Sequence, residues 1–339
     1  YSTVCFLLGI VAFPHFIKFV QNYKLTQKIR EEGLSGGTAK MFKKLHAHKS
    51  GTPTMGGVVI IFSILLIVVF SRVLSYFGFI DHSLLNRGET YLPIFTLAFV
   101  GVLGMVDDYL NITEKSSQKG LSARVKFWSL FAFAVLGAAW FVFKLERTSI
   151  HFPGVGDFEM GLWTFPIFIF ILVGVSNSVN LTDGLDGLAG GLLSISYLIF
   201  AVIAYFFGLP LLSAFCVIVA SAITAFLWFN VPPARIYMGD TGSLTLGGII
   251  AVFAIIVRKE LLIPILAGIF LMENLSVMMQ VAWFKYTKKR YGEGRRIFMM
   301  APLHHHYQKK GIPESKIVSR FWIVGILLAI LTIITLKIR

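Results

Sequence analysis

Long apolar segments separated by polar loops dominate the pattern of this chain. Ten of them approach or reach the roughly 17–25 mostly apolar residues that cross a bilayer as a helix. They cover about 3–22, 54–76, 91–106, 124–143, 162–181, 188–207, 209–229, 243–257, 261–284 and 318–337. The pattern predicts an all-α, polytopic integral membrane protein with about ten transmembrane helices, forming a single domain over residues 1–339.

The composition and the loop charges agree with this interpretation. Hydrophobic residues make up 56% of the chain and charged residues 14%, whereas a soluble domain is about 25% charged. The loops on one side of the predicted bundle carry 19 Lys and Arg residues, and the opposite loops carry 5. Because cytoplasmic loops are enriched in Lys and Arg, the first set is predicted to be cytoplasmic and both termini extracytoplasmic. The net charge of +14 therefore reflects membrane topology and anionic ligands, and no nucleic-acid partner is expected.

Acidic residues gather at the cytoplasmic ends of the predicted helices. The chain has only 17 Asp and Glu residues. Because successive loops alternate between the two sides of the membrane, five of these residues are predicted to lie on the cytoplasmic face. The five are Asp107, Asp108, Asp183, Asp186 and Asp240. Such a gathering predicts an active site at the inner boundary between membrane and water.

Two of these elements suit a divalent cation. Asp107 and Asp108 end an apolar segment in GMVDDYLNI, where negative charge opposes the helix dipole and so favours a functional role. Asp240 lies between glycines in MGDTGSL, where it could ligate a metal or attack phosphorus. Mg²⁺ is usually bound by one or two carboxylates together with substrate phosphates. Tyr237, just before this motif, offers a ring for stacking on a base.

The segment NSVNLTDGLDGLAGG combines acidic, amide and glycine residues. Asp183 and Asp186 are three positions apart and share a face of a helical turn. Asn177 and Asn180 add amide donors and acceptors that suit a nucleobase or a sugar. The pattern predicts a ligand-binding turn rather than a simple helix cap.

Three consecutive histidines occupy the segment APLHHHYQKKG. Successive helical residues point in different directions, so His304, His305 and His306 cannot all reach one metal from a helix, and no cysteine is nearby. The surrounding loop is strongly basic. We therefore expect phosphate or pyrophosphate binding by this loop instead of a zinc site.

Other polar positions carry weaker signals. The segment HKSGTPTMGG could form an anion cradle or an ordinary loop, and Lys126 could contact phosphate or simply flank a helix. Glu273 lies inside an apolar span, where a hydrogen bond between helices is the leading interpretation, and Gln280 could reach a substrate.

TPTMGG, VDDY, NLTDGLDGLAGG, MGDTGSL and PLHHHY, in this order, closely resemble the polyprenyl-phosphate N-acetylhexosamine-1-phosphate transferase superfamily. PLHHHY and the following GIPESKIVSRFW are similar to its bacterial phospho-N-acetylmuramoyl-pentapeptide transferase family. The resemblance implies Mg²⁺-dependent transfer of phospho-MurNAc-pentapeptide from UDP-MurNAc-pentapeptide to undecaprenyl phosphate. The implied products are lipid I and UMP, made in the bacterial plasma membrane by an enzyme that commonly forms homodimers.

The resemblance also implies roles for individual residues. Asp240 would ligate Mg²⁺, and Asp107, with Asp108 beside it, would contact or deprotonate the acceptor phosphate. Lys126 and the loop of His304, His305 and His306 would meet phosphates. The nucleoside pocket would be formed by Asp183, Gly184, Leu185, Asp186 and Asn230, with Lys49, Thr54, Asn177, Asn180, Tyr237 and Gln280 around it.

Three alternatives stay open. Another polyprenyl-phosphate transferase of the same superfamily would use UDP-N-acetylglucosamine as its donor. A CDP-alcohol phosphotransferase has similar Asp-Gly pairs, but its Ala-Arg pair does not follow Asp183 and Gly184. A lipid or solute transporter would place its charged residues near the midplane and often carry repeats.

Overall fold

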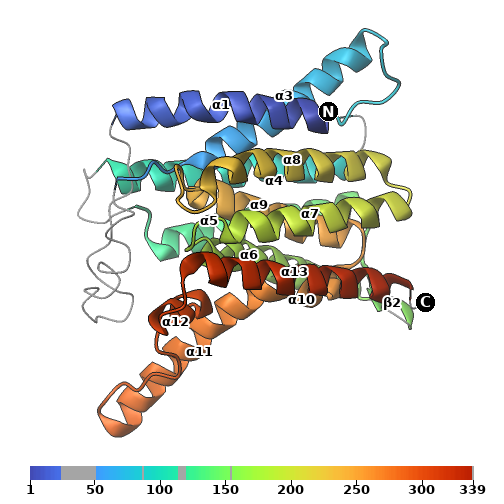
Figure 1. The fold of residues 1–339 in the computed structure, drawn as a ribbon. Helices are drawn as coiled ribbons and strands as arrows, with labels where there is room; N and C mark the ends of the chain where they lie inside the picture. Colours follow the sequence, from blue (N-terminus) through green and yellow to red (C-terminus); the bar gives the residue numbers. More distant parts are fainter. Residues whose placement is uncertain (24–50, 86–87, 114–119, 153–154, 338–339) are drawn as a thin grey trace.

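The computed structural model describes residues 1–339 except 24–50, 86–87, 114–119, 153–154 and 338–339. Long helices running side by side form a bundle in this part of the chain (Figure 1). The helices are α1 (Ser2–Asn22), α3 (Gly56–Tyr76), α4 (Gly88–Ile112), α5 (Ala123–Ala139), α6 (Thr164–Thr182), α7 (Leu188–Phe206), α8 (Pro210–Asn230), α9 (Gly239–Ile256), α10 (Ile263–Leu266), α11 (Gly268–Tyr291), α12 (Leu303–Lys309) and α13 (Glu314–Lys337).

The predicted membrane spans are confirmed by this architecture. Nine helices in the described residues are long and apolar enough to cross a membrane, and a bent pair would make ten. Figure 1 places the two termini at one end of the bundle. The opposite end is called the site end here, because α4, α6 and α8 end there and α5, α7 and α9 begin there.

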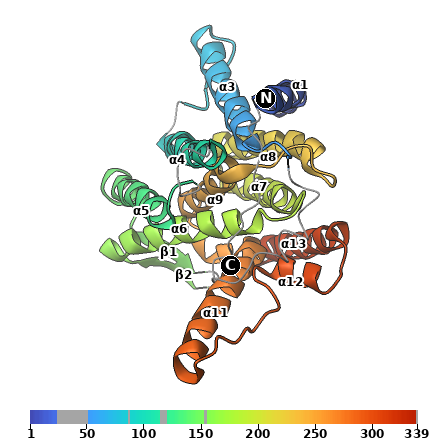
Figure 2. The ribbon, with the colours of Figure 1, turned by 90° about the vertical axis from the view of Figure 1, so that its left-hand side faces the viewer.

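The span predicted over 261–284 is bent instead of straight. A short turn, η4 (Glu260–Leu262), leads into α10, and the segment Glu260–Leu266 meets α11 at 80°. The break lies at Ala267, between Pro264 in the first turn of α10 and Gly268, where α13 approaches closely. As a result, α11 leans away from the bundle in both views (Figures 1 and 2).

A small β-hairpin stands at the end opposite the site. Strands β1 (Ser149–Phe152) and β2 (Gly156–Glu159) pair antiparallel, which the hydrophobic pattern did not predict because each strand has four residues. His151 Nδ1 lies 2.7 Å from Asp157 Oδ1 across the hairpin, and Arg258 Nη2 lies 2.9 Å from Asp157 Oδ2. These contacts attach the hairpin to the segment after α9. The end of α5 continues as one π-helical turn, η2 (Trp140–Lys144), and a 3₁₀ turn, η3 (Gly161–Trp163), precedes α6.

Helix α9 lies at the centre of the bundle, and this burial positions the site. An end-on view shows α9 enclosed by α4, α6, α7 and α8 (Figure 2). Within its membrane-spanning window, 89% of residues are buried, the highest share among the spans of the described chain. A Cβ on Gly104 of α4 would lie 2.5 Å from the Asp240 carbonyl oxygen, so α4 and α9 approach to backbone contact. Small residues permit such approach between membrane helices, and here they bring the acidic ends of α4 and α9 together.

Candidate active site

Three carboxylates converge at the site end of the bundle. Asp107 and Asp108 lie in the last turns of α4, and Asp240 lies in the first turn of α9. One oxygen from each residue lies within 4.8 Å of the other two, which makes this the one acidic cluster of its kind among the described residues. The sequence placed both motifs at helix boundaries, but α4 extends beyond the predicted 91–106 and α9 begins before the predicted 243. The acidic residues therefore belong to the helices themselves.

Lys126, near the start of α5, bridges two of the three carboxylates. Its Nζ lies 2.7 Å from Asp107 Oδ2 and 2.6 Å from Asp240 Oδ2. The Asp107 side chain is 1% exposed, while those of Lys126 and Asp240 are 23% and 22% exposed. Coulomb attraction is strong at such distances in a partly desolvated site. The bridge therefore neutralises negative charge while leaving Asp240 accessible from one side.

The Asp108 carboxylate accepts hydrogen bonds from the first backbone N–H groups of α9. Its Oδ1 accepts a hydrogen bond from the Asp240 N–H at 3.0 Å, and its Oδ2 accepts from the Thr241 N–H at 3.0 Å and the Thr241 hydroxyl at 2.6 Å. The first N–H groups of a helix have no partner within the helix, and a negative charge there also complements the helix dipole. Asp108 thus caps α9 from a neighbouring helix.

The conformation of Gly239 makes room for this cap. Its φ is +75°, in the left-handed region that favours glycine, and a Cβ there would lie 2.4 Å from Asp108 Oδ2. Any other side chain at this position would be strained and would displace the Asp108 carboxylate. The glycine in MGD therefore follows from the close contact between α4 and α9.

Both carboxylate oxygens of Asp107 accept hydrogen bonds. Its Oδ2 accepts from Asn111 Nδ2 at 2.8 Å as well as from Lys126, and its Oδ1 accepts from the Leu121 N–H at 2.7 Å. These bonds connect the end of α4 to the start of α5. Sequence reasoning did not identify Asn111, although its spacing of four residues from Asp107 on one helix face was the available signal.

Asn180 of α6 completes the polar centre around Asp240. Its Nδ2 donates to Asp240 Oδ1 at 2.9 Å and to Ser243 Oγ at 2.9 Å. By contrast, the amide of Asn177 donates to the Val173 carbonyl oxygen of its own helix at 2.8 Å. Of the two predicted asparagines, the structure therefore brings Asn180 into the centre.

The turn over 183–187 lies next to this centre and is joined to the segment after α8. Asp186 Oδ2 accepts from the Ala234 N–H at 3.0 Å. Asn230 accepts from the Gly187 N–H at 2.9 Å and donates to the Ile236 carbonyl oxygen at 2.8 Å. Asp186, Asn230 and Leu185 are buried, so these predicted pocket residues hold the walls of the turn in place.

Asp183, the other acidic residue of the turn, lies beside the carboxylates. Burial, together with the nearby charges of Asp240 and Asp108, raises its pKa to about 7, and a hydrogen bond from the Gly239 N–H opposes the shift. Because burial and like charges both disfavour ionisation, the charge of Asp183 responds to pH near neutrality.

The three histidines have three different environments on α12. His304 is buried, with its N–H 3.2 Å from Glu273 Oε1 and its Nδ1 3.2 Å from Glu273 Oε2. The opposite edge of its ring packs on Gly184, where a Cβ would lie 2.4 Å from Nε2. His304 thus connects the buried Glu273 of α11 to the residue after Asp183. The predicted hydrogen bond between Glu273 and another helix is confirmed, and its partner lies on α12.

His305 packs against the His304 ring, with 4.1 Å between the ring centres, but His305 and His306 have hydrogen-bond partners of their own. His305 Nδ1 lies 2.7 Å from Gln308 Oε1. His306 Nδ1 accepts from the Met299 N–H at 3.1 Å, and burial lowers the His306 pKa. An accepting Nδ1 requires the neutral ring with its proton on Nε2. Hydrogen bonds therefore hold the loop before α12 against a neutral His306.

The remaining predicted residues lie on the loops around the centre. Tyr237 pairs through its backbone with the segment that contains the buried Thr54, since the Tyr237 N–H donates to the Pro53 carbonyl oxygen at 2.8 Å. Gln280 Oε1 accepts from the Ile297 and Phe298 N–H groups, each at 3.0 Å, and so orders the loop after α11. Lys49 lies outside the described residues.

Comparisons with known proteins identify the family. Residues 90–258 match Glycosyl transferase family 4, and residues 49–61 match phospho-N-acetylmuramoyl-pentapeptide-transferase signature 1. The chain is 40% identical to the phospho-N-acetylmuramoyl-pentapeptide-transferase of Flavobacterium psychrophilum, over 98% of this chain and 91% of that protein. It is 43% identical to the enzyme of the same name from Geobacillus thermodenitrificans, over 97% and 95% of the two chains.

The alignments with these relatives include nearly all of the helices described above. The Chlorobaculum parvum protein of the same name is 39% identical over 98% of this chain and 90% of its own. Together with the helical bundle, this places the chain as a multi-pass protein of the bacterial inner membrane. The chain is a transferase that belongs to the phospho-N-acetylmuramoyl-pentapeptide-transferase family.

Proposed function

We propose that this chain transfers phospho-MurNAc-pentapeptide from UDP-MurNAc-pentapeptide to undecaprenyl phosphate, giving lipid I and UMP. In this reaction an oxygen of the lipid phosphate forms a bond to the sugar-linked phosphorus, and the bond from that phosphorus to the bridging oxygen of UMP breaks. The observation that carries the proposal is the bridge of Asp107, Lys126 and Asp240 at the site end of a membrane bundle. Phosphoryl transfer depends on positioning and charge stabilisation, which are the functions such a centre can supply.

The carboxylate oxygens around Asp240 are suitable ligands for a hard cation such as Mg²⁺. Carboxylate oxygens of Asp107, Asp108 and Asp240 lie within reach of one another, and Asp240 is the partly exposed member. We propose Asp240 as the ligand, because both oxygens of Asp108 already cap α9. When bound, Mg²⁺ would neutralise charge on the diphosphate and on the departing UMP.

Lys126 and Asp107 would act on the phosphates directly. Lys126 lies between the two carboxylates, so its ammonium can turn from Asp240 toward a phosphate oxygen that enters beside it. Asp107 would then be positioned to contact or deprotonate the acceptor phosphate, held by Asn111 and the Leu121 N–H. Asp108 would support this arrangement by fixing the first turn of α9.

The walls next to the centre would receive the uridine and the sugar. Asp183 and Gly184 border the carboxylates, and Tyr237 offers a ring on the neighbouring loop. The further residues proposed for this pocket are Leu185, Asp186, Asn230, Asn177, Asn180, Thr54, Gln280 and Lys49. Helix α12, which carries His304, His305 and His306, would lie over the donor phosphates, supported by the packing of His304 on Gly184.

We further propose that residues 1–339 form one catalytic domain with the site end facing the cytoplasm and both termini outside. The Lys and Arg excess in the loops at that end supports this orientation. A homodimer is expected from the family resemblance alone.

A donor-exchange assay tests the proposed substrate. Purified protein with Mg²⁺ and undecaprenyl phosphate is given either UDP-MurNAc-pentapeptide or UDP-N-acetylglucosamine, and UMP release is measured. We expect UMP from the first donor and background levels from the second. Release with UDP-N-acetylglucosamine alone would assign the chain to a different reaction of the superfamily, and no release with either donor would overturn the proposal.

A further inference from the structure

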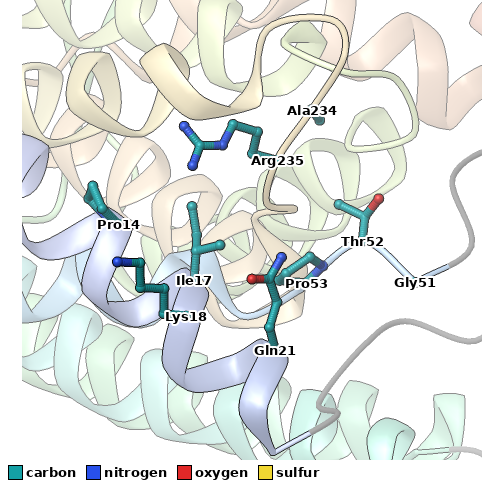
Figure 3. A pocket seen from close by; sticks show the side chains of 9 residues that line it. All are labelled: Pro14, Ile17, Lys18, Gln21, Gly51, Thr52, Pro53, Ala234 and Arg235. Atoms are coloured by element: carbon teal, nitrogen blue, oxygen red, sulfur yellow. The ribbon is translucent and has the colours of Figure 1, made fainter.

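A pocket of about 390 Å³ lies beside α1, outside the carboxylate centre. Its walls come from α1, from the segment before α3 and from the loop after α8 (Figure 3). Lys18 and Gln21 of α1 lie on one side of it, and Arg235 lies on the other. None of the residues that line it belongs to the polar centre around Asp240. This pocket therefore needs an explanation of its own.

The lining changes from apolar to polar along one face of α1. Pro14, Ile17, Lys18 and Gln21 are spaced at intervals of three, four and seven positions from Pro14, which places them on the same helix face. At 1.5 Å per residue, the face runs about 10 Å from Pro14 to Gln21. The apolar members come first, and the cation and the amide lie nearer the site end. Such a gradient suits a ligand with an apolar tail and a charged head.

The two cations of the pocket have no carboxylate partner in the part of the chain that the structure describes. The ion pairs there involve Lys126, His151, Arg258 and His304, and neither Lys18 nor Arg235. The Arg235 guanidinium carbon lies 5.5 Å from the centre of the Phe229 ring, a contact that leaves its N–H groups available. Arg235 and Lys18 therefore bring two positive charges to one concave site.

We propose that this pocket binds the phosphate headgroup of an anionic phospholipid. Lys18 and Arg235 would contact the phosphate, Gln21 would donate a hydrogen bond at its rim, and an acyl chain would follow Pro14 and Ile17. Cations at the membrane surface attract anionic lipids, and a guanidinium can bind a phosphate with two parallel hydrogen bonds. The apolar part of the lining favours a lipid over free phosphate, which would contact only the polar part.

The pocket shares two backbone segments with the loops of the candidate active site. Ala234 lines it and donates its N–H to Asp186, and Pro53 lines it and accepts from the Tyr237 N–H. A bound headgroup would thus brace the segments that hold Asp186 and Tyr237. The proposed binding does not depend on the identity of the transferred sugar.

A binding experiment on the full chain in neutral detergent tests the proposal. The thermal unfolding midpoint is followed during titration with dioctanoyl phosphatidylglycerol, dioctanoyl phosphatidylcholine or inorganic phosphate at constant ionic strength. A ligand that binds the folded state raises the midpoint as its concentration increases. We expect saturable stabilisation by phosphatidylglycerol only. Equal stabilisation by phosphatidylcholine would overturn the headgroup assignment, and equal stabilisation by inorganic phosphate would overturn the lipid assignment.

Variants locate the site. The double substitution Lys18→Gln/Arg235→Gln is expected to weaken phosphatidylglycerol binding by about tenfold or more, because it removes both phosphate contacts. Gln21→Trp should weaken binding by filling the pocket at unchanged charge. Lys316→Gln/Arg320→Gln removes the same charge from exposed positions on α13 and should leave the affinity unchanged. Equal loss in this control, or full binding in both pocket variants, would overturn the proposal.

Discussion

Asp108 caps the helix that carries Asp240. Its carboxylate accepts hydrogen bonds from the backbone N–H groups of Asp240 and Thr241, each at 3.0 Å. The adjacent carboxylate of Asp107 has a different function, because it shares the Lys126 ammonium with Asp240. Two neighbouring acidic residues therefore divide their roles between holding a helix and forming the charged centre.

Removing the cap should cost stability. Asp108→Ala leaves the first N–H groups of α9 without a partner and is expected to destabilise the fold by about 1–2 kcal/mol. Asp107→Ala keeps the cap and should have the smaller effect on the thermal unfolding midpoint. The two midpoints, measured in the same detergent, check this difference. Equal midpoints would contradict the division of roles.

Lys126 is expected to compete with a divalent cation for Asp240. Lys126→Gln removes the ammonium 2.6 Å from Asp240 Oδ2 and leaves the carboxylates with more negative charge. Turnover should fall by about 100-fold or more, since a charged contact to phosphate is lost. At the same time, Mn²⁺ should bind more tightly, as measured by electron paramagnetic resonance of the free ion. Weaker Mn²⁺ binding in this variant would count against the competition.

Glu273 should position His304 through contacts inside the protein. The Glu273 side chain is fully buried and is the partner of the His304 N–H. Glu273→Ala leaves that donor buried without an acceptor and should cost about 1–3 kcal/mol of stability. Glu293→Ala, at an exposed position beyond α11, is the matched control and should leave the thermal midpoint unchanged. Similar midpoints for the two variants would show that the contact is dispensable.

Asp183 should make stability depend on pH. Its pKa is raised from 3.8 to about 7 in the folded chain, so the folded state binds the proton more tightly than the unfolded state. Stability should therefore fall as pH rises from about 4 to about 7, and level off above that range. Asp183→Asn removes this contribution. The thermal unfolding midpoint of the variant should therefore exceed that of the native chain by more at pH 8 than at pH 5. The opposite trend would mean that Asp183 is stabilised in its charged form.

The contact between α4 and α9 can be tested with two glycines. A Cβ on Gly104 would lie 2.5 Å from the Asp240 carbonyl oxygen, whereas a Cβ on Gly174 of α6 would meet no atom within 4 Å. Gly104→Ala should separate α4 from α9 and reduce both thermal midpoint and activity, at a cost of about 1–3 kcal/mol. Gly174→Ala should be tolerated. Full activity of Gly104→Ala would contradict the proposed close packing.

The sequence predicted the spans and the acidic motifs, but not how the motifs connect. Apolar runs identify helices such as α7 and α8 because lipid exposure and burial both favour apolar side chains. The cap by Asp108 and the bridge by Lys126 depend on contacts between residues more than a hundred positions apart. The pattern of apolar and polar residues along the chain does not predict such contacts. The bend at Ala267 was missed for a related reason, since composition alone does not distinguish a broken span from a straight one.

The most direct measurement is UMP release from UDP-MurNAc-pentapeptide and undecaprenyl phosphate by two charge-matched variants. Asp240→Asn changes the accessible carboxylate of the centre, and Asp157→Asn changes one in the hairpin at the other end of the bundle. We predict that Asp240→Asn lowers turnover by about 1000-fold, while Asp157→Asn keeps it near that of the native chain. Retained turnover in Asp240→Asn would contradict the central role of this residue.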